Sequence, residues 1–99
     1  MAALEATRAA GNERFGKKEF GAAIEIYTAA LEVEMEDRER ALLYSNRAAC
    51  RLATKAYVEA AKDATSATEL NPDLAKAWFR LATAELKRKR FPLKPSRRL

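Results

Sequence analysis

Two pairs of polar residues with the same spacing could bind a negatively charged group. Arg8 and Asn12 are four residues apart, and so are Lys76 and Arg80. Residues four apart lie on the same face of a helix, so each pair would present its donors together. Arg and Lys form charge-assisted hydrogen bonds with carboxylates, and Asn donates through its NH2 without adding charge. The two pairs therefore predict a site that binds a carboxylate.

Helices must position these side chains, and the apolar spacing predicts helices over most of the chain. Apolar residues step by three and four from Phe20 to Leu31, from Leu42 to Leu52 and from Tyr57 to Leu70, as on one face of a helix. Asn71-Pro72 ends one of these helices, because Pro cannot continue a helix. The expected elements are helices over residues 2–17, 20–31, 39–54, 57–70 and 74–90, with a turn over residues 34–39.

The same pattern occurs more than once along the chain. Phe20 and Tyr57 begin similar segments 37 residues apart, and Tyr44 and Trp78 are related at an offset of 34. Such a period fits an array of helical hairpins, and Asn46 then lies level with the two polar pairs. Helices that pack closely need small residues where they cross. The predicted crossing residues are Gly11, Ala23, Ala30, Ala48, Ala60, Ala67 and Ala82.

These repeated segments resemble tetratricopeptide repeats over about residues 4–91. The segments that carry the resemblance are residues 11–15, 20–32, 44–50, 67–72 and 76–80. It implies an all-α fold of antiparallel helix hairpins in a right-handed superhelix, in which the first helix of each hairpin lines a concave groove. About five helices are expected, and the third repeat is incomplete. The implied division is a repeat domain over 1–91, with repeats at about 4–37, 41–74 and 75–91, followed by a basic, Pro-containing tail over 92–99.

The five polar residues resemble the dicarboxylate clamp of tetratricopeptide co-chaperones. Such domains bind the acidic C-terminal Glu-Glu-Val-Asp tail of heat-shock chaperones of the seventy- and ninety-kilodalton classes. The resemblance implies that Asn12 and Asn46 hold the terminal carboxylate together with Arg8, where the family more often has Lys. Lys76 and Arg80 would hold the Asp side chain. The apolar groove wall for the Val of the peptide would consist of Phe15, Ala49 and Phe79.

Two other binding functions are compatible with the sequence. The groove of the repeats could bind an unrelated internal helix or strand, in which case a free carboxylate would not matter. Residues 87–99 carry a charge of +7, whereas residues 1–86 carry −2. This basic segment could serve nucleic acid or nuclear import. The simpler explanation is a solvated helix end whose cations suit the helix dipole, so nucleic acid is the weaker alternative.

The residue inventory argues against catalysis. The chain has no His and a single Cys, Cys50, so neither a Cys-His pair nor a normal zinc ligand set can form. There is no Gly-rich phosphate-binding loop. We expect no enzymatic activity, no cofactor and no metal, and Cys50 is predicted to be an inert core thiol. No segment is apolar enough to serve as a signal peptide or to span a membrane, which predicts a cytoplasmic protein.

The predicted last helix has no following helix to cover it. Pro92 and Pro95 prevent a regular helix after residue 91, so the apolar residues Trp78, Leu81 and Leu86 would lack a partner. Either the tail folds back over them or a second copy covers them, because terminal repeats need a cap. We expect self-association, with a homodimer formed through this helix. The tail residues that could fold back are Phe91, Leu93 and Leu99.

Overall fold

The computed structural model describes residues 2–90, which form five α-helices. They confirm the prediction of an all-α fold with five helices, and no strand occurs among the described residues. The tail over 92–99, and the predicted fold-back of Phe91, Leu93 and Leu99, lie outside the described residues. The helices are α1 (Ala2–Gly16), α2 (Phe20–Ala30), α3 (Asp37–Ala53), α4 (Tyr57–Leu70) and α5 (Ala75–Arg90).

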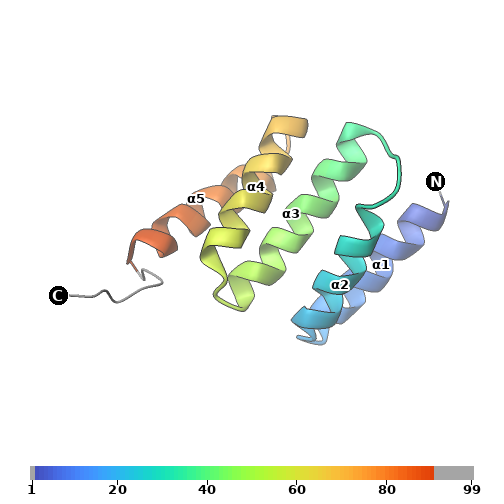
Figure 1. Ribbon diagram of the computed structural model, residues 1–99, viewed down its shortest axis with the longest axis horizontal. Coiled ribbons are helices and arrows are strands. Elements are labelled where there is room, and N and C mark those ends of the chain that lie inside the picture. The colour runs from blue at the N-terminus through green and yellow to red at the C-terminus, as the bar shows by residue number, and fades with distance from the viewer. Residues whose placement is uncertain (1, 91–99) are drawn as a thin grey trace.

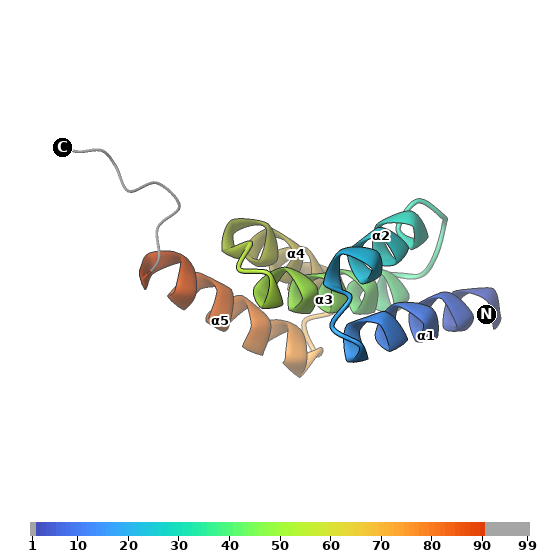
Figure 2. The ribbon, with the colours of Figure 1, turned by 90° about the horizontal axis from the view of Figure 1, so that it is seen from below.

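Consecutive helices pack side by side in two layers. In Figure 1 the helices succeed one another across the molecule from α1 to α5. Figure 2 shows α1, α3 and α5 along one side and α2 and α4 along the other. Helix α3 is central, since it contacts all four other helices. We call the side formed by the three odd-numbered helices the α1–α3–α5 face; the polar residues singled out above all belong to these helices.

Small residues allow the helices to pack this closely. The core is dominated by fully buried alanines, and Tyr27, Leu43 and Cys50 are among its few large members. Helix α1 meets α2 at Gly11, where an added Cβ would lie 2.4 Å from Cε1 of Tyr27. That distance is far inside van der Waals contact, so only glycine fits there. The predicted burial of Cys50 is confirmed.

The α1–α2 and α3–α4 turns have the same backbone structure. Lys18 and Lys55 both adopt a left-handed conformation, with φ of 63° and 65°. In each turn the next amide donates to a carbonyl five residues back, from Glu19 to Arg14 and from Ala56 to Arg51. This is the Schellman arrangement, which satisfies carbonyls that a helix end would leave unpaired. The two turns lie 37 residues apart, the offset expected from the sequence.

The structure differs from the sequence-based expectations at the start of α3 and at two residues of α5. Helix α3 begins at Asp37, inside the expected turn over 34–39, because Asp37 and Glu39 suit the positive end of the helix dipole. Ala82 is exposed rather than at a helix crossing, since no described helix covers that side of α5. Leu81, which was expected to lack cover, is partly buried and packs on the cluster of Ala60, Ala61 and Ala84.

Candidate functional site

The candidate site is built around the buried hydroxyl of Tyr27. The ring is only 1% exposed, and its hydroxyl donates a hydrogen bond to Oδ1 of Asn12 at 2.5 Å. This bond fixes the amide of Asn12 against α2, although the rest of the side chain is exposed. No described residue accepts a hydrogen bond from the NH2 group of Asn12. The amide is therefore oriented by one oxygen and keeps its two donors for another group.

Arg80 reaches from α5 to α3 and is anchored there. Its Nη1 donates to the carbonyl oxygen of Ser45 at 3.1 Å and to Oγ of the same residue at 2.9 Å. No described residue bonds to Nε or Nη2, so one edge of the guanidinium keeps its donors. Burial lowers the pKa of Arg80, but the group remains charged because an arginine does not deprotonate in a protein.

Arg8 completes the set of cations near Tyr27. Burial raises the pKa of Tyr27 to about 12 and the Cys50 thiol adds to this rise, whereas Arg80 and Arg8 oppose it. Cations on α1 and α5 therefore act on the same hydroxyl on α2. Nε of Arg8 is buried without a hydrogen-bond partner among the described residues. The structure thus places Arg8, Asn12 and Arg80 around the same hydroxyl group of Tyr27.

Asn46 belongs to α3 and Lys76 to α5, and each is placed here by its relation to Arg80. Asn46 follows Ser45, the residue on α3 to which Arg80 is anchored, and its side chain is half-buried. Lys76 is exposed one helical turn before Arg80. Neither side chain has a partner among the described residues. Their donors are therefore unused, but no hydrogen bond within residues 2–90 joins them to Arg8, Asn12 or Arg80.

The predicted apolar wall residues each follow a polar site residue by three positions. Phe15 follows Asn12, Ala49 follows Asn46 and Phe79 follows Lys76, so each pair shares a helix face. Phe79 is 71% exposed and Phe15 is 38% exposed. The ring of Phe15 packs edge-on against Phe20 with centroids 5.3 Å apart. These apolar side chains give the face an uncovered hydrophobic surface next to its donors.

The sequence-based interpretation missed a buried ion cluster behind this face. Asp63 of α4 is 3% exposed and accepts a bidentate pair of hydrogen bonds from Arg47 at 2.9 and 2.8 Å, and a third from Arg51 at 3.0 Å. Nη1 of Arg47 also donates to Thr28 of α2. The hydrogen bond with Asp63 raises the pKa of Arg47. The sequence did carry a signal for this buried ion pair. Asp63 lies three residues after Ala60 and four before Ala67, so its carboxylate is on the apolar face of its helix.

Within residues 2–90, no group of three or more Cys, Asp or Glu side chains could hold a metal ion. None of the five described helices is both long enough and apolar enough to cross a membrane.

Comparisons with known proteins place the chain among heat-shock and co-chaperone sequences. No protein-family model matches. The chain is 45% identical over 80 residues to heat shock protein sti1 homolog of Schizosaccharomyces pombe, a match of 81% of this chain and 13% of that protein. It is 40% identical over 75 residues to the Hsp70/Hsp90 co-chaperone CNS1 of Saccharomyces cerevisiae, a match of 75% of this chain and 20% of the relative.

A solved structure with the same architecture supports this relationship. The crystal structure of the Sgt2 TPR domain from Aspergillus fumigatus matches with a TM-score of 0.80 and 33% sequence identity. The match covers 91% of this chain and 58% of that one. The chain spans at most a fifth of the length of the two relatives named above. Fold and sequence thus agree, while the relatives contain much that this chain does not match.

Proposed function

This chain is a tetratricopeptide-repeat domain of the type found in co-chaperones, and we propose that it binds the acidic C-terminal peptide of a heat-shock chaperone. The peptide lies on the α1–α3–α5 face, and its terminal carboxylate and last Asp side chain meet the five polar residues. The chain acts as an adaptor in the cytoplasm and has no catalytic role of its own.

One observation carries this proposal: cations and an oriented amide from α1 and α5 converge on the hydroxyl of Tyr27. Asn12 is held by one hydrogen bond to Tyr27 and Arg80 by two to Ser45, and both side chains keep unused donors. Side chains held in advance lose little conformational freedom when a ligand arrives. A hydrogen bond to a charged acceptor contributes about 1.5–3 kcal/mol. A few such bonds suffice for specific binding of a short peptide end.

The partner class is proposed from the relatives. One similar protein is named as a heat shock protein and another as a co-chaperone of Hsp70 and Hsp90. Chaperones of these classes have tails that end in Glu-Glu-Val-Asp, as the family resemblance implies. Such a tail offers two carboxylates on its last residue, which suits a cluster of separate donors. The exposed Phe79 and Phe15 offer apolar contact to the Val.

Calorimetric titration with two peptides tests the proposal. The first ends in Glu-Glu-Val-Asp with a free carboxylate, and the second is identical but C-terminally amidated. We expect the amide to bind at least about tenfold more weakly, because it loses a charged acceptor worth more than 1.4 kcal/mol. Added salt should weaken binding of the free acid. Equal affinity for both peptides would favour an internal peptide ligand and contradict the clamp.

Substitutions at α5 test which residues carry the binding. Lys76→Ala removes an exposed cation that has no described partner, so it should weaken peptide binding about tenfold while leaving stability unchanged. Lys62→Ala is the matched control, because Lys62 is exposed on α4 in the other layer. Arg80→Ala should also weaken binding, but it removes the contacts to Ser45 and therefore needs a parallel unfolding measurement. Wild-type affinity in Lys76→Ala would rule out its assigned role.

A further inference from the structure

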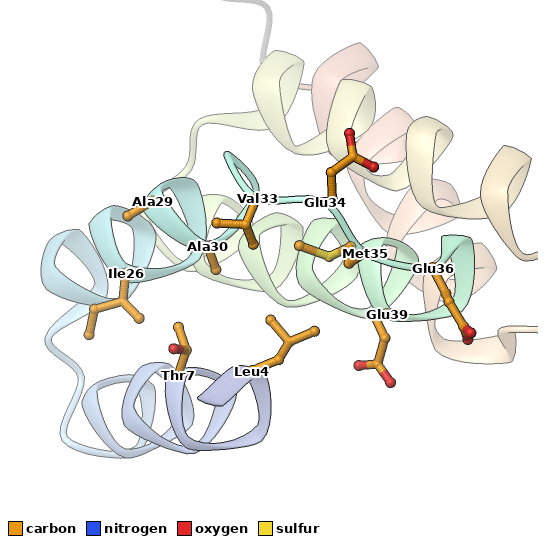
Figure 3. Close-up of a pocket in the computed structure, with 10 residues that line it drawn as sticks. All are labelled: Leu4, Thr7, Ile26, Ala29, Ala30, Val33, Glu34, Met35, Glu36 and Glu39. Carbon is orange, nitrogen blue, oxygen red and sulfur yellow. The ribbon is translucent and has the colours of Figure 1, made fainter. Parts of the chain in front are cut away.

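An open pocket lies at the α1–α2 end of the molecule, away from the candidate site. Its volume is about 840 Å³ and its lining comes from α1, α2, the following loop and the start of α3. Figure 3 shows Leu4 of α1 opposite Ile26 of α2 and Met35 of the loop, which together form an apolar floor. Val33 at this pocket is 54% exposed. Within the part of the chain that the structure describes, this end of the array thus presents an exposed apolar surface.

Acidic residues lie along one side of this floor, in the loop after α2 and at the start of α3. Glu34, Glu36 and Glu39 all line the pocket, and Figure 3 shows Glu34 and Glu36 projecting outward from the chain. Oε1 of Glu39 is buried and has no hydrogen-bond partner among the described residues. A buried acceptor without a partner is uncommon in native proteins. The pocket therefore suits an occupant that combines apolar and cationic side chains.

The opposite end of the molecule presents such a combination. Along α5, Trp78, Ala82 and Leu86 follow one another at intervals of four, so they form a stripe on one helix face. Trp78 is 49% exposed and Leu86 is 58% exposed. Lys89 lies on the same face as Leu86, within a last turn that consists of four basic residues. The stripe ends in positive charge, whereas the pocket at the other end of the molecule has an acidic rim on the side of α3 and the loop that precedes it.

We propose that the α5 stripe of one copy docks in the α1–α2 pocket of a second copy. The stripe cannot reach the pocket of its own chain, because α5 is packed on α4 at the far end of the molecule (Figure 1). Pairing α5 with α5 would instead bring two basic helix ends into one interface. Docking stripe to pocket joins opposite charges and continues the stacking of helices from one copy into the next.

This contact is heterologous, so each docked pair still has one free pocket and one free stripe. The expected product is a series of oligomers rather than a closed dimer, as the surfaces on α5 and on α1–α2 are different. This docking does not depend on peptide binding, because the stripe and the pocket involve none of the five polar site residues. Its failure would leave the proposed peptide-binding function intact.

Light scattering and sedimentation of the full chain test the docking. The average mass should rise beyond that of a dimer with increasing concentration, and it should fall when salt is added. The rim variant Glu34→Lys/Glu36→Lys and the stripe variant Leu86→Glu/Lys89→Glu should each self-associate at least about tenfold more weakly. The control Glu59→Lys/Glu69→Lys makes the same charge change as the rim variant at exposed residues of α4 and should associate like the wild type.

A mixture of two variants with complementary defects shows which surfaces meet. One is the single substitution Leu86→Glu, which retains an intact pocket. The other is the rim variant Glu34→Lys/Glu36→Lys, which retains an intact stripe. Together they should form a species that stops at two chains, since each contributes only one functional surface. Three results would overturn the proposal: a monomeric wild type at all concentrations, full self-association of the rim variant, or a mixture that remains monomeric while the wild type associates. Circular dichroism verifies that each variant is folded.

Discussion

At the scale of single residues, Tyr27 links the packing of the fold to the candidate site. Its ring occupies the space that any side chain at position 11 would need. Its hydroxyl orients Asn12 and lies in the field of Arg80 and Arg8. A change that moves the ring must therefore disturb both stability and the arrangement of the donors.

The first prediction concerns stability in alkaline solution. Burial raises the pKa of Tyr27 from 10.0 to about 12 and that of the Cys50 thiol from 9.0 to about 11. Above about pH 9 the unfolded chain loses protons that the folded chain keeps. The free energy of unfolding should therefore have its full value below about pH 9. It should decrease as the pH rises toward 12, by up to about 1.4 kcal/mol per pH unit for each group. Urea titrations between about pH 8 and about pH 11 measure this decrease in the free energy of unfolding.

Single substitutions identify the groups responsible. Tyr27→Phe should flatten the loss of stability above about pH 10, and Cys50→Ala should flatten the part that begins near pH 9. A pH dependence that is identical in Tyr27→Phe and in the wild type would contradict the assignment.

The second prediction concerns the two glycines with different surroundings. Gly11→Ala should lower the free energy of unfolding by about 2–3 kcal/mol, because the new methyl group would overlap the Tyr27 ring. Gly21→Ala should raise it by about 0.5 kcal/mol, since nothing lies within 4 Å of its added Cβ and the unfolded chain loses freedom. Denaturant unfolding compares the two variants. Equal effects would mean that α1 and α2 do not approach at Gly11.

At the scale of elements, the helices are joined by turns in which lysine occupies a position that favours glycine. Lys18 and Lys55 have positive φ, which costs a residue with a Cβ about 1–2 kcal/mol. The turns form nevertheless, because they satisfy the carbonyls at the ends of α1 and α3. These lysines are thus local strain that the packing of the hairpins overcomes.

Replacement of these lysines by glycine gives the third prediction. Lys18→Gly and Lys55→Gly should each raise the free energy of unfolding by about 0.5–1 kcal/mol, because glycine adopts positive φ without a steric penalty. Lys17→Gly is the control, since Lys17 precedes the left-handed residue in the same turn and does not have positive φ. It should be neutral or destabilising in thermal unfolding. A stabilisation equal to that of Lys18→Gly would point to charge, not backbone conformation.

At the scale of the whole molecule, one carboxylate joins three of the five helices. Asp63 of α4 binds Arg47 and Arg51 of α3, and Arg47 continues to Thr28 of α2. The side chains of Asp63 and Arg47 are only 5% and 14% exposed. This cluster connects the helices of both hairpins, in a protein whose core consists mostly of small residues.

The fourth prediction is that Asp63→Ala lowers the free energy of unfolding by about 3–5 kcal/mol, because it leaves buried guanidinium charge without its partner. The loss should affect the whole chain in one transition, as the cluster spans both hairpins. Asp73→Ala, at an exposed turn residue, should change stability by less than about 0.5 kcal/mol. Denaturant unfolding followed by circular dichroism measures both. A loss below about 1 kcal/mol for Asp63→Ala would show that the cluster is not structurally important.

The helical architecture could be read from the amino-acid sequence, because periodic apolar residues, small crossing residues and Asn71-Pro72 act locally or at a fixed repeat. The candidate site residues could be proposed from it too, since Arg8 with Asn12 and Lys76 with Arg80 each share a helix face. It took the folded arrangement to reveal that Ser45 anchors Arg80, that Tyr27 orients Asn12 and that Asp63 is buried between two arginines. Those contacts join residues 12 to 35 positions apart, and no local periodicity specifies which distant side chains will meet. Ala82 was expected at a helix crossing and is exposed. Its burial would depend on another helix that packs over it, which the local sequence pattern does not specify.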